Sequence, residues 1–153
     1  MQLAISQPEL VNKLIIASAF YKKSGAIKGF FENMKNATIA DMPLIYKEAY
    51  LKINHDSAGL QRMFNRDWTR MMEFTDWTDD EIGSIHAPSL IIAGDNDVVT
   101  KEHAVEMAHK IRNSQLLIVP GNHGSYIGEA FAAQPGSKMP VLTVSVVEEF
   151  LGR

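Results

Sequence analysis

The chain has 153 residues, of which 46% are hydrophobic and 22% charged, a composition typical of one folded domain with a sizeable core. Its formal net charge is -3 and its longest basic run is Lys22-Lys23, so we expect no nucleic-acid partner. The sequence has no cysteine, which excludes disulfides and thiol nucleophiles and fits a reducing compartment. No apolar stretch approaches the roughly 20 residues of a membrane span, and the N-terminus lacks the pattern of a secretion signal. We therefore expect a cytoplasmic protein that binds no membrane.

The chain begins with a helical pattern followed by a strand pattern. Residues 1–11 look like the tail of a helix, because no capping residue precedes them. Residues 13–19 form an apolar run consistent with a strand of a parallel sheet. We expect a helix and then a strand.

Residues 24–85 differ from the rest of the chain because none of them has a convincing strand pattern. We expect long helices over residues 26–39, 43–54 and 58–74, and a capping box from Thr78 to Glu81 that opens a fourth. This segment is rich in large adaptable side chains, which pack between helices or line an apolar pocket: Trp68, Trp77, Met34, Met42, Met63, Met71 and Met72.

Two further apolar runs each end in a turn that carries polar side chains. Residues 89–94 run into a turn with two carboxylates, and residues 115–119 run into a glycine-rich turn with His123. A helical pattern over residues 101–113 separates the two strands, as in a βαβ unit with parallel strands. We therefore expect Asp97 and His123 to emerge at the same edge of the sheet, where ligands bind in open α/β folds.

The remaining helical patterns have no expected role at a site. The helix over residues 101–113 is predicted to hold His103 and His109 near its solvent side. Residues 139–151 are rich in valine, but the acidic pair Glu148-Glu149 and the final Gly152 favour a helix there.

An acid and a histidine that face one crevice suit a triad of nucleophile, histidine and acid. Asp97 would accept a hydrogen bond from Nδ1 of His123 and fix the tautomer of the ring. Nε2 would then take a proton from the nucleophile.

At these residues the chain resembles the α/β-hydrolase family over nearly its whole length. Residues 90–97, Leu-Ile-Ile-Ala-Gly-Asp-Asn-Asp, look like the family's strand and acid turn, and residues 119–124, Val-Pro-Gly-Asn-His-Gly, look like its histidine loop. Residues 8–16 resemble the link from the helix after the nucleophile into the next strand. The resemblance implies that Asp97 and His123 are catalytic, that residues 24–85 form a helical cap over the substrate, and that no cofactor or metal takes part.

The chain departs from the family at the nucleophile. The family places a serine in a Gly-x-Ser-x-Gly turn ahead of the acid and the histidine, and this sequence has no such turn. Ser125 lies too close to His123 to serve, and these other serines also lack the flanking glycines: Ser6, Ser18, Ser24, Ser57, Ser84, Ser89, Ser114, Ser137 and Ser145. We therefore expect the C-terminal part of a hydrolase, inactive by itself.

Two other interpretations remain open. Residues 95–99, Asp-Asn-Asp-Val-Val, resemble the motif of haloacid-dehalogenase-like phosphotransferases, in which Asp95 would be the nucleophile and Asp97 its partner at a Mg²⁺ ion. That family has a later lysine and acidic pair that cannot be placed here. Alternatively Asp95 and His123 are turn residues of a noncatalytic interaction module.

The expected architecture is an α/β fold over residues 1–153, a partial three-layer α/β-hydrolase-like sandwich with about three parallel strands and a helical cap subdomain over residues 24–85. The strand over residues 13–19 would expose its backbone edge, which favours a homodimer through that edge. The expected substrate of the family is a small, apolar, ester-like compound.

Overall fold

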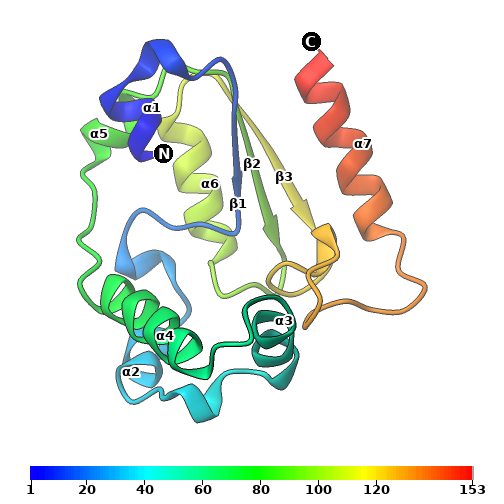
Figure 1. The fold of residues 1–153 in the computed structure, drawn as a ribbon. Helices are drawn as coiled ribbons and strands as arrows, with labels where there is room; N and C mark the ends of the chain where they lie inside the picture. The colour runs from blue at the N-terminus through cyan, green and yellow to red at the C-terminus, as the bar shows by residue number, and fades with distance from the viewer. Residues whose placement is uncertain (153) are drawn as a thin grey trace. The chain divides into compact units, whose positions relative to one another are not determined.

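The structure, a computed structural model, describes residues 1–152 and contains the expected parallel sheet. Its three strands are β1 (Leu14–Ala17), β2 (Ser89–Gly94) and β3 (Ser114–Val119), in the order β1-β2-β3 (Figure 1). Both pairs are parallel, so all three strands end at the same edge of the sheet. The predicted α/β class, with three parallel strands and flanking helices, is confirmed.

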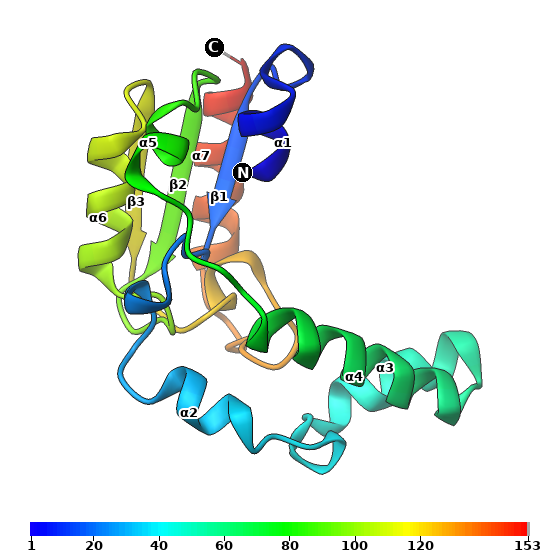
Figure 2. The ribbon, with the colours of Figure 1, turned by 90° about the vertical axis from the view of Figure 1, so that its left-hand side faces the viewer.

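Helices cover both faces of this sheet. Helix α6 (Lys101–Lys110) lies on one face, together with α1 (Gln2–Ser6) and α5 (Asp79–Gly83), and α7 (Met139–Gly152) lies on the other (Figures 1 and 2). Every residue of β2 is buried, because this central strand is covered on both sides.

Alternate residues of β2 feed two separate cores. Ile91 packs in the core on the α6 side with Met107, and Leu90 and Ile92 pack in the core on the α7 side with Phe150. The two-residue period of a strand thus divides one short apolar run between two layers. The position of the turn at the end of β2 is therefore fixed by packing on both faces.

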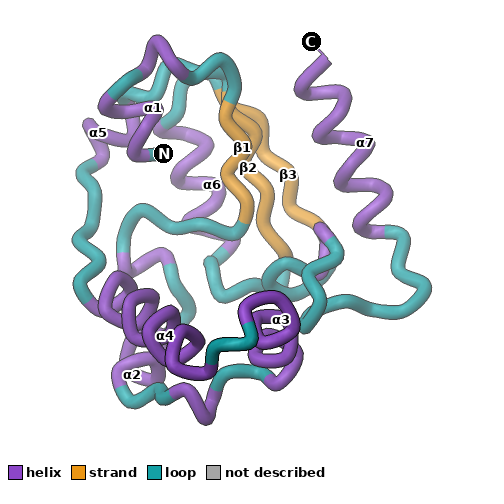
Figure 3. The backbone as a smooth tube through the Cα atoms, in the orientation of Figure 1, coloured by secondary structure: helices purple, strands orange, loops and turns teal. Residues whose placement is uncertain are grey.

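Residues 28–75 form a second compact unit, which we call the helical unit; residues 1–27 and 76–152 form the sheet unit. The helical unit contains α2 (Phe30–Lys35), a 3₁₀ turn (Ile39–Asp41), α3 (Leu44–Asn54) and α4 (Ser57–Met72) (Figure 3). The indole Nε1 of Trp68 donates to the backbone oxygen of Met34 at 2.8 Å and ties α4 to α2. Two half-buried members of the expected helix-packing set therefore hold this unit together.

The helix predicted over residues 26–39 is much shorter than expected. Ala26 forms an antiparallel bridge with Val99, and the backbone N–H of Ile27 donates to the oxygen of Val98 at 2.9 Å. Gly29 then has φ +84°, outside the helical region, so α2 begins only at Phe30. Pairing with the turn after β2 has replaced the first turn of the predicted helix. The pattern over residues 1–11 is likewise split, into α1 and a 3₁₀ turn (Pro8–Leu10).

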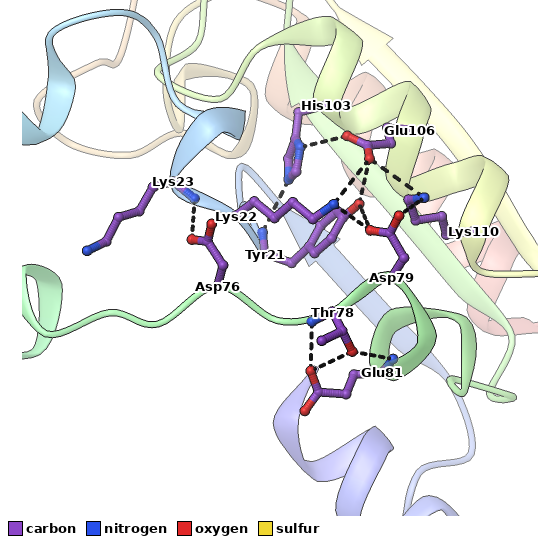
Figure 4. A network of polar contacts seen from close by, with 10 residues as sticks. All are labelled: Tyr21, Lys22, Lys23, Asp76, Thr78, Asp79, Glu81, His103, Glu106 and Lys110. Atoms are coloured by element: carbon purple, nitrogen blue, oxygen red, sulfur yellow. Dashed lines mark hydrogen bonds and ion pairs between the residues drawn. The ribbon is translucent and has the colours of Figure 1, made fainter.

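A polar cluster fixes the segment that follows β1 against α5 and α6 (Figure 4). The fully buried Tyr21 stacks on the His103 ring, with 4.6 Å between ring centroids. Its backbone N–H donates to His103 Nε2 at 3.2 Å, and its hydroxyl oxygen lies 2.8 Å from a carboxylate oxygen of Glu106 and 3.2 Å from one of Asp79. Lys22 and Lys110 neutralise the two carboxylates, with contacts to Asp79 at 2.5 and 2.6 Å.

The prediction that His103 lies near the solvent is wrong. Its side chain is only 3% exposed. The ring fills the space over Gly25, where an added Cβ would lie 2.4 Å from the ring. A glycine far away in the sequence therefore admits the ring to the interior, which helix periodicity does not reveal. His109, in contrast, is exposed.

In the described part of the chain, no helix combines the length and the apolar character that crossing a bilayer requires.

Candidate functional site

The turns after β2 and β3 interlock through their main chains. The N–H of Asp95 donates to the oxygen of Val119 at 2.8 Å, and the N–H of Asn96 donates to the oxygen of Gly121 at 3.1 Å. In return the N–H of Gly121 donates to Oδ1 of Asp95 at 2.8 Å, and the side chains of Asn96 and Asn122 are bonded at 2.9 Å. The acid turn and the histidine loop therefore form one rigid assembly.

This interlocking requires a glycine at the end of β2. A Cβ on Gly94 would lie 2.3 Å from the backbone oxygen of Gly121 and 3.1 Å from that of Asn122. Gly121 itself has φ +141°, a backbone conformation that residues with a side chain rarely adopt. The two loops approach more closely than any other residue at position 94 would allow.

Asp97 and His123 meet where the two turns join. His123 Nδ1 lies 2.8 Å from Oδ1 of Asp97, whose side chain is 0% exposed, whereas that of His123 is 54% exposed. Backbone N–H groups of Gly94 and Val99 also donate to the carboxylate, at 3.2 and 3.3 Å. The fourth donor is the hydroxyl of Ser18. The carboxylate is thus held by two donors on each oxygen.

These contacts shift the pKa values of both side chains. Burial raises the pKa of Asp97, but the hydrogen bonds from His123, Ser18 and the Gly94 N–H outweigh it and hold the pKa below its ordinary value of 3.8. The hydrogen bond to Asp97 raises the pKa of His123 above 6.5, although desolvation acts in the opposite direction. An ionised carboxylate can only accept, so Nδ1 carries a proton and Nε2 is the nitrogen left for proton transfer.

Asp95 has a different environment from Asp97. It is exposed, and its carboxylate accepts from the Gly121 N–H within the turn. The two carboxylates thus engage different partners, and Asp97 is turned to His123. No group of three or more His, Asp or Glu side chains suited to a metal ion occurs among residues 1–152. This arrangement gives no support to the phosphotransferase interpretation.

Two residues that the sequence did not single out also belong to the site. Ser18 contacts Asp97, and the hydroxyl of the fully buried Tyr126 lies 2.6 Å from that of Ser18. No sequence motif marks either of them, because each reaches the site from an element outside the acid turn. Ser125, in contrast, is buried and donates to the backbone oxygen of Asn122 at 2.9 Å. It stabilises the histidine loop.

No family model and no curated protein matches this chain. Several solved structures do match, and each of the three matches described below covers 99% of this chain. A serine hydrolase involved in carbazole degradation matches with a TM-score of 0.65 at 18% identity over 58% of its own chain. A meta-cleavage product hydrolase from Pseudomonas fluorescens matches with 0.65 at 18% identity over 59%, and an enol-lactonase from Burkholderia xenovorans with 0.60 at 15% identity over 60%.

The chain therefore spans about three fifths of the length of these structures. At such low identity the likeness concerns the fold and leaves the chemistry open. It confirms the resemblance noted from the acid turn and the histidine loop: the described chain has part of the α/β-hydrolase fold.

Proposed function

We propose that Asp97 and His123 are the acid and the general base of a serine-type hydrolase that acts on carboxylic esters or related acyl compounds. The observation that carries this proposal is the 2.8 Å contact between the buried Asp97 carboxylate and Nδ1 of the half-exposed His123. When a buried acid binds Nδ1 of a histidine, Nε2 remains available to exchange a proton with the reacting groups. Acyl transfer requires such a general base.

In the proposed reaction the serine oxygen attacks the carbonyl carbon, and the serine proton moves to Nε2 of His123. Asp97 stabilises the imidazolium that forms. The same proton passes from Nε2 to the leaving alcohol as the C–O bond breaks. Water repeats the cycle on the acyl-enzyme and releases the acid, which restores the serine and the neutral ring.

The serine in this proposal comes from polypeptide outside residues 1–153. These residues contain no Gly-x-Ser-x-Gly turn, and the chain matches about three fifths of each hydrolase structure. Loss of the nucleophile alone costs on the order of 10⁶ in turnover, and the other two members of a triad do not recover it. We therefore infer that the 153-residue chain is inactive as an esterase by itself.

The proposed substrate is small and largely apolar. The helical unit contains Trp68 and a set of methionines, which adapt to irregular apolar ligands: Met34, Met42, Met63, Met71 and Met72. One structural neighbour is named as a lactonase, and a lactone is a cyclic ester. Both observations favour a largely apolar, ester-like compound.

The experiment is to sequence the gene upstream of the Met1 codon and to express any in-frame extension together with residues 1–153. We expect a Gly-x-Ser-x-Gly turn in the extension and hydrolysis of p-nitrophenyl butyrate by the longer protein. His123→Ala should lower kcat on the order of 10⁶-fold and Asp97→Asn by about 10⁴-fold. Ser145→Ala, which removes an exposed hydroxyl on α7, is the matched control and should retain full activity.

Two results would contradict the proposal. Ester hydrolysis by the purified 153-residue chain, if abolished by His123→Ala, would mean that the nucleophile lies within these residues. Hydrolysis by the longer protein that survives His123→Ala would remove His123 from the reaction.

A further inference from the structure

Ser18 lies at the end of β1 in an unusual backbone conformation. The strand ends at Ala17, and the N–H of Ser18 continues the ladder by donating to the oxygen of Ile92 at 2.9 Å. Its φ is +47°, a left-handed value that a residue with a Cβ seldom adopts unless its surroundings enforce it. Such outliers occur preferentially at functional sites. At this position the bend turns the Ser18 side chain toward the acid of the site.

The Ser18 hydroxyl connects two groups that have fixed roles. It contacts Oδ2 of Asp97, and its oxygen lies 2.6 Å from the hydroxyl of Tyr126. Asp97 is ionised and can only accept, so the single hydroxyl hydrogen of Ser18 is directed to the carboxylate. The hydrogen between the two hydroxyls therefore belongs to Tyr126, whose other acceptor, the backbone oxygen of Ile92, lies farther away at 3.4 Å. The bonds run in one direction, from Tyr126 to Ser18 to Asp97.

Tyr126, the first donor in this series of hydrogen bonds, is held rigidly. Tyr126 is fully buried, and its ring packs in the α7-side core with Leu90 and Ile92. Burial raises the pKa of its hydroxyl, which therefore keeps its proton and remains a donor. The Tyr126 side chain, which core packing holds in place, thus fixes the orientation of the Ser18 hydroxyl.

We propose that Ser18 and Tyr126 are positioning residues that hold the Asp97 carboxylate with Oδ1 toward His123. This inference rests on the proposed function, since it assigns their task to the same acid and base. The other two hydrogen bonds to the carboxylate, from the N–H groups of Gly94 and Val99, are longer, at 3.2 and 3.3 Å. Without the Ser18 hydroxyl, Oδ2 keeps one long hydrogen bond, from the Gly94 N–H, and the carboxylate is held less firmly in the orientation that faces the imidazole.

The test uses the 153-residue chain and needs no turnover. The pKa of His123 and the Nδ1 proton signal are measured by NMR on ¹⁵N-labelled protein, with the melting temperature recorded in parallel. In Ser18→Ala we expect the pKa of His123 to fall by roughly half a pH unit or more, because a hydrogen bond to a charged group contributes on the order of one pKa unit. The Nδ1 proton should exchange with water at least about threefold faster.

Three further variants separate positioning from folding. Ser18→Gly removes the hydroxyl but accepts the positive φ, so it should lower the pKa of His123 as Ser18→Ala does while melting at a higher temperature than Ser18→Ala. Tyr126→Phe keeps the Ser18 hydroxyl but frees it to rotate, and should produce a smaller fall. Ser145→Ala removes an exposed hydroxyl on α7 and should leave His123 unchanged.

An unchanged pKa of His123 in both Ser18 variants would overturn this inference. A rise would overturn it as well, because it would mean that the hydroxyl only withdraws charge from Asp97. Lack of ester hydrolysis by the longer protein would refute the proposed function, whereas the NMR result on His123 decides the role of Ser18 independently.

Discussion

Replacing Gly94 by alanine tests whether the close approach of the two turns holds Asp97 and His123 together. The added Cβ would lie 2.3 Å from the backbone oxygen of Gly121, and an ordinary contact begins at 3.4 Å, so the histidine loop must retreat by about 1 Å. A retreat of that size stretches the 2.8 Å bond between Asp97 and His123 beyond hydrogen-bonding distance.

Two energy terms set the expected destabilisation by Gly94→Ala. Overpacking costs about 1–3 kcal/mol, and the loss of one hydrogen bond adds about 1 kcal/mol. A loss of roughly 2–4 kcal/mol corresponds to a melting temperature lower by about 5–15 °C for a chain of this size. Circular dichroism measures the melting, and NMR measures the pKa of His123, which should fall toward 6.5.

The matched control is Gly83→Ala. A Cβ on Gly83, in α5, meets only the backbone oxygen of Lys110, at an ordinary 3.8 Å. This variant should melt at or slightly above the melting temperature of the parent protein, because the substitution adds up to about 1 kcal/mol to the free energy of unfolding. If Gly94→Ala had the same melting temperature as the parent protein and the same pKa of His123, the close approach of the loops would not hold the site together.

Three other outcomes follow from the contacts. Asp97→Asn should lower the pKa of His123 toward or below 6.5, because it weakens the hydrogen bond that raises this pKa and removes the carboxylate charge; an unchanged value by NMR would contradict the assigned pair. Burial holds the pKa of His103 in the folded protein below 6.5, so the stability linked to this group is present above pH 6.5 and is lost as pH falls from 6.5 through that lower pKa. The melting temperature should therefore change less between pH 7.5 and pH 5 in His103→Gln than in the parent protein, and parallel profiles would refute this. We also propose a homodimer through the free edge of β1, so Ala17→Pro, which removes an outward N–H, should shift light scattering from dimer to monomer; a parent protein that stays monomeric at all concentrations would exclude the dimer.

The sequence predicted those elements whose patterns depend on their own residues. The strands over residues 89–94 and 115–119 are apolar runs with clear boundaries, and both appear within one residue of the expected positions. The capping box from Thr78 to Glu81 is present, with reciprocal hydrogen bonds. The valine-rich segment is helix α7, as its acidic pair and final glycine indicated.

Three of the misses share one physical cause, which is a contact with a distant residue. The turn after β2 pairs with Ala26 and Ile27 and shortens the helix predicted there. Gly25 makes room for the ring of His103. Ser18 reaches Asp97 only because its backbone turns to a positive φ at the end of β1. Local periodicity carries no information on any of these contacts.

The contact between Asp97 and His123 was predictable because it depends on strand order and not on their mutual attraction. The main-chain bonds of Asp95 to Val119 and of Asn96 to Gly121 contain no titratable donor or acceptor. The spacing between the two turns therefore persists when His123 gains or loses a proton. A general base must keep its position through that change of charge, because reorganisation at the moment of proton transfer would add to the barrier. Parallel strands that end at one edge would give the proposed general base, His123, this constancy.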